Sequence, residues 1–215
     1  DVFEEAKARS CELVVTHHPL IFQSIKQVNS DSYDGRNLLY LIENGIASLN
    51  LHTNLDCCPG GVNDVLASRL GLANVEILNP VDTDAKGRPY GLVRMGEVAE
   101  QPLAAFAAFV KRALSCPGVR FSDAGKPVRR VAVGGGSCGS EIGDVIAAGC
   151  DTFVTADLKY NHFEEAKYRG LNLIDAGHFE TENPVCDVLE GILREAFPEI
   201  PVFRARTHRD ETQFL

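Results

Sequence analysis

The stretch "KARSCELVVTHH", residues 7–18, runs from the end of a helical pattern through a short apolar segment to two adjacent histidines. A short apolar, β-branched segment bounded by polar residues is typical of a buried strand. The same order returns in "IAAGCDTFVTAD", residues 146–157, where cysteine, acid and the Val-Thr pair fall at matching places. In each copy a helical pattern, a glycine and a second apolar strand follow. The two stretches therefore predict two related lobes.

Helical and strand patterns alternate along the rest of the chain, which is typical of an α/β fold. We expect two similar α/β lobes with a largely parallel sheet, related by an internal repeat. The N-terminal lobe is predicted at residues 1–80 and the C-terminal lobe at residues 131–215. Residues 81–130 are expected to form a connecting segment with a strand and a helix, and residues 200–206 a last strand.

The composition limits the classes of partner. The net charge of −9 argues against binding to a nucleic-acid backbone, which needs a basic face. No run of about 18 apolar residues is present, so no membrane span is expected. The seven cysteines follow no zinc-ribbon or CxxC spacing. Reduced thiols in a cytoplasmic protein are the expected state.

Histidines and acids gather where the predicted strands end. Two of these places carry a His-x-x-x-acid pattern, "HTNLD" at residues 52–56 and "HFETE" at residues 178–182. Open α/β sheets bind ligands at the carboxyl ends of their strands, so these side chains are expected to meet in the cleft between the lobes. Imidazole with carboxylate suits zinc, iron, manganese or nickel better than calcium or magnesium. The candidate residues are His17, His18, His52, Asp56, His178 and Glu182.

The adjacent histidines favour two ions over one. Side chains of neighbouring residues leave an extended chain in roughly opposite directions, so a single ion rarely takes both. Two ions roughly 3.5–4 Å apart can take one histidine each. Taken singly, His18 also fits a structural histidine, Asp56 a turn, and Glu182 a carboxylate that complements a helix dipole. Their occurrence together favours the metal interpretation.

Two other segments leave alternatives open. "GGGSCGS", residues 134–140, joins a strand to a helix start, where a phosphate can bind. It lacks the GK[ST] of a Walker loop, and a tight turn packed closely on its neighbour is the other interpretation. Lys159, after the strand in "DTFVTAD", is either an anion-binding group or a solvated surface residue.

Seven motifs follow one another along the chain: "THHPLIF" (16–22), "HTNLD" (52–56), "GGVNDVLASRLGL" (60–72), "GLVRMGEV" (91–98), "VAVGGGSCGS" (131–140), "DTFVTADLKYNH" (151–162) and "DAGHFETE" (175–182). By these motifs the chain resembles the GTP cyclohydrolase I type II homologue family, the NIF3-like family of dinuclear metal proteins. The resemblance implies two similar lobes, dimers assembled into a hexameric ring, and metal ligands at His17, His18, Asp56, His178 and Glu182, with Glu182 bridging. Members begin earlier, with a strand and a helix that we expect to be missing from the lobe at residues 1–80.

The repeat makes His52 the counterpart of His178, while the family pattern leaves it either a sixth ligand or an acid/base group. We expect a metal-dependent hydrolase in which two divalent ions supply hydroxide and His52 and Glu182 are catalytic. The expected substrate is small and anionic or nucleotide-like. The compound that is hydrolysed is expected to be a nucleotide, a phosphoester or an amide. The alternative is a non-catalytic metal-binding or protein-interaction ring. A single structural zinc is disfavoured because no cysteine cluster exists.

Overall fold

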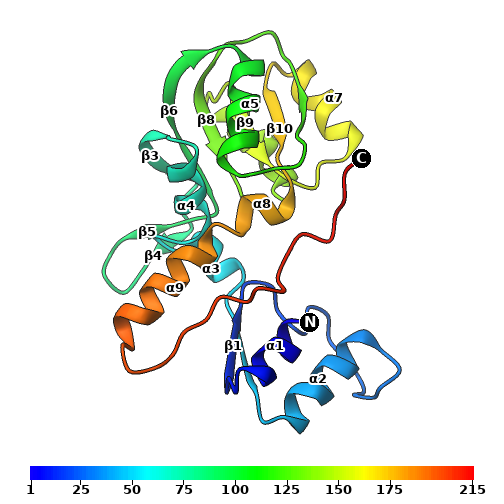
Figure 1. Cartoon of the computed structure of the whole chain (residues 1–215). Coiled ribbons are helices and arrows are strands. Elements are labelled where there is room, and N and C mark those ends of the chain that lie inside the picture. Colours follow the sequence, from blue (N-terminus) through cyan, green and yellow to red (C-terminus); the bar gives the residue numbers. More distant parts are fainter. The chain divides into compact units, whose positions relative to one another are not determined.

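The computed structural model describes residues 1–215, and the chain forms two compact units (Figure 1). Unit 1 comprises Asp1–Leu55 with Pro201–Arg209, and unit 2 comprises Asp56–Ile200 with Asp210–Leu215. The division at residues 80 and 130 stays a prediction. None of the helices has the length and apolar character needed to cross a membrane.

Unit 1 is built on a pair of parallel strands. Strand β1 pairs in register with β2, from Leu13 opposite Ala47 to Thr16 opposite Asn50. The elements are α1 (Val2–Ala8), β1 (Leu13–Thr16), α2 (Tyr33–Glu43) and β2 (Ala47–Asn50), followed by the short helix α3 (Thr53–Cys57). The core of this unit consists of four buried residues: Ala6 from α1, Val14 from β1, Leu41 from α2, and Ile46 immediately before β2.

Unit 2 contains a six-stranded mixed sheet in the order β3-β6-β8-β9-β10-β7. Only the β8–β9 and β9–β10 pairs are parallel, while β3–β6, β6–β8 and β10–β7 are antiparallel. The prediction of a largely parallel sheet is therefore wrong. The strands are β3 (Ala73–Leu78), β6 (Val93–Gln101), β7 (Arg120–Ser122), β8 (Val128–Val133), β9 (Thr152–Thr155) and β10 (Asn172–Asp175).

The antiparallel pair β3–β6 arises where no crossover helix separates the two strands. β3 was missing from the prediction, and it reaches β6 through the small hairpin of β4 (Asp82–Thr83) and β5 (Pro89–Tyr90). An antiparallel pair needs only such a short connection, whereas a parallel pair needs a long crossover. Helices α6 (Ile142–Ala147) and α7 (Tyr160–Tyr168) supply those crossovers for β8, β9 and β10.

Helices cover both faces of this sheet. Along each central strand, successive residues belong to opposite cores, as Phe153 and Val154 do on β9. Helices α4 (Val62–Arg69) and α5 (Leu103–Ala113) pack on the face that carries Val154, and α6 and α7 on the face that carries Phe153 (Figure 1). The strands β9 and β10 are thus buried on both sides, as is usual for parallel neighbours covered by helices, whereas the edge strands β3 and β7 are largely exposed.

Both His-x-x-x-acid patterns coil into short helices rather than ending strands. The first lies at α3, and the second forms α8 (His178–Glu182), which precedes α9 (Val185–Ala196). On a helix, residues four apart share one face. The predicted last strand is also wrong, since residues 200–206 form no strand. Both units contain parallel strand pairing, but a two-stranded sheet in unit 1 against a six-stranded sheet in unit 2 leaves the internal repeat unconfirmed.

Glu5 of α1 binds the segment where the last strand was expected. Its carboxylate accepts hydrogen bonds from the backbone N–H groups of Arg206 and Thr207, at 2.8 and 3.0 Å, and from the Thr207 hydroxyl at 3.0 Å. These bonds lower the pKa of Glu5. The Arg9 guanidinium also lies 5.0 Å from the centre of the Phe203 ring, so side chains rather than a strand ladder attach the segment 201–209 to unit 1.

Glu5→Ala should release this segment, because two backbone donors and one hydroxyl lose their acceptor. We expect faster amide exchange and faster proteolysis within residues 201–209. Glu4→Ala is the matched control, since Glu4 is exposed and pairs with the N-terminal amine. Equal protection of the segment in both variants would contradict this account.

Candidate metal centre

Three imidazoles lie together in unit 1. His17 and His18 directly follow β1, and His52 follows its parallel neighbour β2, so the strand pairing itself brings them together. The ring centroids are 5.2 Å apart for His17–His18 and for His17–His52, and 5.5 Å apart for His18–His52. Their candidate ligand nitrogens all lie within 4.8 Å of one another. The predicted convergence of these histidines is observed within this unit.

The spacing of these nitrogens fits a metal ion. Ligand nitrogens about 2.0–2.1 Å from zinc are about 3.4 Å apart in a tetrahedron, so small side-chain rotations suffice. The Nδ1 of His17 lies 2.7 Å from the carbonyl oxygen of Leu51. With the proton on Nδ1, this contact leaves Nε2 as the ligand atom. The Phe22 ring meets His52 edge-on at 5.9 Å, which places an apolar wall beside the imidazoles.

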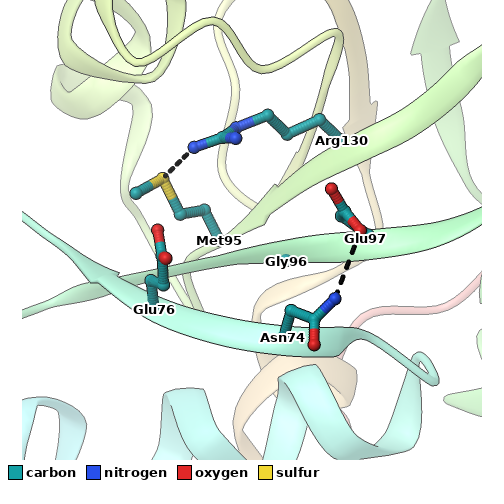
Figure 2. Close-up of a pocket in the computed structure, with 6 residues that line it drawn as sticks. All are labelled: Asn74, Glu76, Met95, Gly96, Glu97 and Arg130. Atoms are coloured by element: carbon teal, nitrogen blue, oxygen red, sulfur yellow. Dashed lines mark hydrogen bonds between the residues drawn. The ribbon is translucent and has the colours of Figure 1, made fainter.

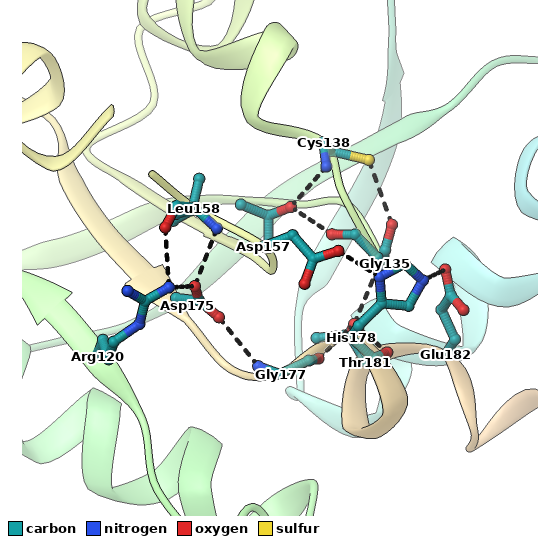
Figure 3. Close-up of polar contacts among 12 residues, drawn as sticks. Arg120, Gly135, Cys138, Asp157, Leu158, Asp175, Gly177, His178, Thr181 and Glu182 are labelled. Carbon is teal, nitrogen blue, oxygen red and sulfur yellow. Dashed lines mark hydrogen bonds and ion pairs between the residues drawn. The ribbon is translucent and has the colours of Figure 1, made fainter. Parts of the chain in front are cut away.

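In unit 2 the second pattern presents an imidazole and a carboxylate from one helical turn. The Nε2 of His178 lies 3.1 Å from Glu182 Oε1 across α8 (Figure 3). Carboxylate oxygens of Asp56 and Glu182 lie within 4.8 Å of each other. Asp56 is 7% exposed, and two carboxylates this close in a shielded place repel each other. A cation would relieve that repulsion, so the donor set of unit 2 also fits a divalent metal.

The glycine turn after β8 packs directly against this group. A Cβ on Gly136 would lie 2.1 Å from Glu182 Oε1 and 3.1 Å from His178 Nε2. Gly136 donates its N–H to the Thr181 hydroxyl at 3.0 Å, and Gly135 donates to Asn63 Oδ1 at 2.7 Å. These amides are used inside the protein and do not face a phosphate. Of the two interpretations of "GGGSCGS", the structure supports the tight turn.

Two buried side chains hold the backbone around Asp56. Asn63 is fully buried, and besides accepting from Gly135 it donates to the Asp56 carbonyl oxygen at 3.1 Å. Arg94 is 1% exposed, pairs with Asp64, and donates to the carbonyl oxygens of Cys57 at 3.1 Å and Cys58 at 3.4 Å. Sequence reasoning missed both residues, because neither stands beside a candidate ligand in the chain.

The thiols near the site are protonated. Burial raises the pKa of Cys138, in the glycine turn, to about 12, and burial also raises the pKa values of Cys57 and Cys58. A thiol must lose its proton to bind a metal or to act as a nucleophile. This agrees with a centre built from imidazole and carboxylate.

The remaining polar features do not extend the site. Lys159 is exposed, in agreement with a solvated lysine. A cavity of about 60 Å³ lies beside β3 and β6, and Figure 2 draws the residues that line it. Among them, Asn74 donates to Glu97 at 3.3 Å and Arg130 contacts the Met95 sulfur at 3.6 Å. The cavity has room for a few water molecules, whereas small-molecule sites occupy roughly 300–1,000 Å³.

The structure thus places the six predicted residues as two groups. His17, His18 and His52 lie in unit 1, and Asp56, His178 and Glu182 lie in unit 2. The three imidazoles are a group that could hold a metal, and Glu182 lies close to both His178 and Asp56. Their assignment as one ligand set, and the catalytic roles of His52 and Glu182, stay predictions.

Gly136→Ala should disrupt the unit 2 group, because the new methyl would overlap Glu182 Oε1 and the backbone φ of +63° disfavours alanine. The backbone strain alone costs about 1–3 kcal/mol of stability, measurable by urea denaturation. Gly143→Ala is the matched control, since Gly143 is helical with nothing within 4 Å of its Cβ position. Equal stability of the two variants would refute this packing constraint.

His178 should titrate unusually high in the metal-free chain. The hydrogen bond to Glu182, with that to Asp157, raises its pKa to about 9 against the opposing effect of burial. Because the unfolded pKa is about 6.5, the resulting stabilisation is complete below that pH and is lost as pH rises through about 9. Glu182→Gln should lower the pKa measured by NMR. Glu190→Gln, which removes a carboxylate from α9, should leave it unchanged, and an unshifted Glu182→Gln titration would argue against the pair.

Comparisons with known proteins identify the family of the chain. A protein of Clostridium perfringens named GTP cyclohydrolase 1 type 2 homolog is 31% identical over 220 residues, covering 100% of this chain and 82% of the relative. One of the same name from Streptomyces coelicolor is 39% identical over 194 residues, covering 87% and 67%. A crystal structure of a Staphylococcus aureus hypothetical protein superposes with a TM-score of 0.91 at 30% identity, covering 100% and 83%. The Duf34/NIF3 family (NGG1p interacting factor 3) matches residues 1–211, and the chain belongs to this family.

Proposed function

We propose that the chain binds two divalent transition-metal ions, through the imidazoles of His17 and His18 and through Asp56, His178 and Glu182. The observation that carries the proposal is the spacing of donor atoms inside each unit, three imidazoles in one and an imidazole between carboxylates in the other. Zinc, iron, manganese and nickel all suit such donors, and their availability decides among them.

The reaction proposed for this centre is hydrolysis. Bound divalent ions supply a water whose pKa is lowered toward neutrality. His52 is a candidate for proton transfer, because an imidazole can accept a proton on one ring nitrogen and release one from the other. Its Nδ1 lies 3.3 Å from the Thr53 hydroxyl, which leaves Nε2 as the second nitrogen. Glu182 is the second candidate for proton transfer. The names of the relatives favour a small anionic, nucleotide-like substrate over other phosphoesters or amides.

A non-catalytic role is the second candidate. The family description names an interacting factor, which favours a metal-stabilised protein that presents surfaces to partners. A hexameric ring of dimers in the cytoplasm, without nucleic-acid or membrane partners, fits either role. The two roles differ in the ligands of the ions. Water in a coordination position supports hydrolysis, and complete protein ligation supports the interaction role.

Metal analysis of the full chain tests the proposal. We expect close to two transition-metal ions per chain and a large loss in both Asp56→Ala and Glu182→Ala. Glu190→Ala, which removes a carboxylate from α9, should keep the parent content. One ion or none in the parent would overturn the two-ion proposal.

Hydrolysis is tested by a screen with GTP, a phosphodiester and an amide. Turnover by the metal-loaded parent should disappear together with the metal in Glu182→Ala. Turnover that survives unchanged in a metal-free variant would refute a metal-dependent reaction. Absence of turnover on every substrate, with two ions bound, would favour the interaction role.

A further inference from the structure

Asp157 stands directly against the imidazole of His178. It follows β9, and its Oδ2 lies 2.7 Å from His178 Nδ1 (Figure 3). The opposite ring nitrogen, Nε2, is the one that lies 3.1 Å from Glu182. The ring is therefore held at both ends, with Asp157 on one nitrogen and the candidate metal-binding carboxylate on the other.

The backbone of Asp157 has a left-handed conformation. Its φ is +53°, in the left-handed region that aspartate and asparagine tolerate better than most residues. The next residue, Leu158, donates its N–H to the carboxylate of Asp175 at 3.0 Å. The bend that turns Asp157 toward the imidazole is thus fixed by a hydrogen bond within the same unit.

Asp175 also fixes the start of α8. It is 6% exposed, pairs with Arg120, and accepts from the Gly177 N–H at 3.2 Å. Arg120 donates in turn to the Leu158 carbonyl oxygen at 2.9 Å. One buried carboxylate therefore binds both the residue after Asp157 and the residue before His178. This network, drawn in Figure 3, sets the distance between the two side chains.

We propose that Asp157 is the positioning residue for His178, holding the proton on Nδ1 so that Nε2 is presented as the metal ligand. The proposal rests on the metal-binding function proposed above. A carboxylate behind a ligating imidazole fixes its tautomer and orientation and makes the ligand nitrogen more basic. In unit 1 the carbonyl oxygen of Leu51, which is uncharged, is placed to fix the tautomer of His17 in the same way. Asp157 supplies the charged counterpart for His178.

Asp157→Asn tests the inference, because asparagine keeps the size and tolerates the left-handed backbone. The asparagine amide can donate to Nδ1, which would move the ring proton to Nε2 and block the ligand atom. Zinc alone is the probe, added to the full chain in a chelator competition. We expect zinc affinity to fall about 10- to 100-fold. Asp123→Asn removes an exposed carboxylate elsewhere in unit 2 and should retain parent affinity.

A second readout separates positioning from general structural damage. Long-range ¹H–¹⁵N spectra of the zinc-loaded parent should show His178 protonated at Nδ1 and bound through Nε2, with its signals assigned by comparison with His178→Gln. In Asp157→Asn the Nδ1–H signal should weaken or vanish, while backbone amide spectra keep the parent pattern.

The outcomes are distinguishable. Parent-like zinc affinity and a parent-like ring signal in Asp157→Asn would overturn the role of Asp157 and leave metal binding intact. A parent that binds no zinc would instead refute the proposed function. The ring spectra of the metal-free chains, recorded above pH 9 where the His178 ring is neutral, then test Asp157 alone. Loss of the Nδ1–H signal in the variant supports the inference, and an unchanged signal overturns it.

Discussion

The close packing of the glycine turn after β8 against α8 is the constraint on which the ligand group of unit 2 depends. The site of Gly136 has no space for a Cβ, because the carboxylate of Glu182 already occupies it. The same turn donates amides to Thr181 of α8 and to Asn63, which in turn holds the backbone of Asp56. One turn therefore sets the distance between α8 and the backbone around Asp56, which are far apart in the chain. This distance positions the carboxylates of Glu182 and Asp56.

Charge is the second organising factor of this unit. Glu182 and Asp157 bring negative charge to the two ring nitrogens of His178, and the buried Asp56 places a third carboxylate within 4.8 Å of Glu182. In the metal-free chain the raised pKa of His178 lets its proton balance part of this charge. A divalent ion would balance more of it. Nearby thiols stay protonated because burial raises their pKa values, so they do not compete as ligands.

Sequence patterns were most successful where a contact follows from local geometry. Two histidines after β1 and one after β2 meet because parallel neighbours end at the same edge. The His178–Glu182 spacing was recognised, but as a strand end. The two side chains lie close together because residues four apart share one face of a helix, here α8. The sheet was mispredicted because β3 was missed, and because alternating patterns do not reveal the direction of β6 and β7, whose partners β8 and β10 follow after other elements.

Residue types alone determined the chemistry of the candidate centre. Histidine and carboxylate motifs, with no cysteine cluster, indicated an imidazole–carboxylate metal site and the family to which the chain belongs. Only the tertiary structure decided how the ligands are held. Asp157, Asn63, Arg94 and Gly136 act through contacts across 7 to 72 positions of the chain, such as Asp56–Asn63 and Asn63–Gly135. Such contacts depend on which strands pair and how closely loops pack, and no local pattern encodes either.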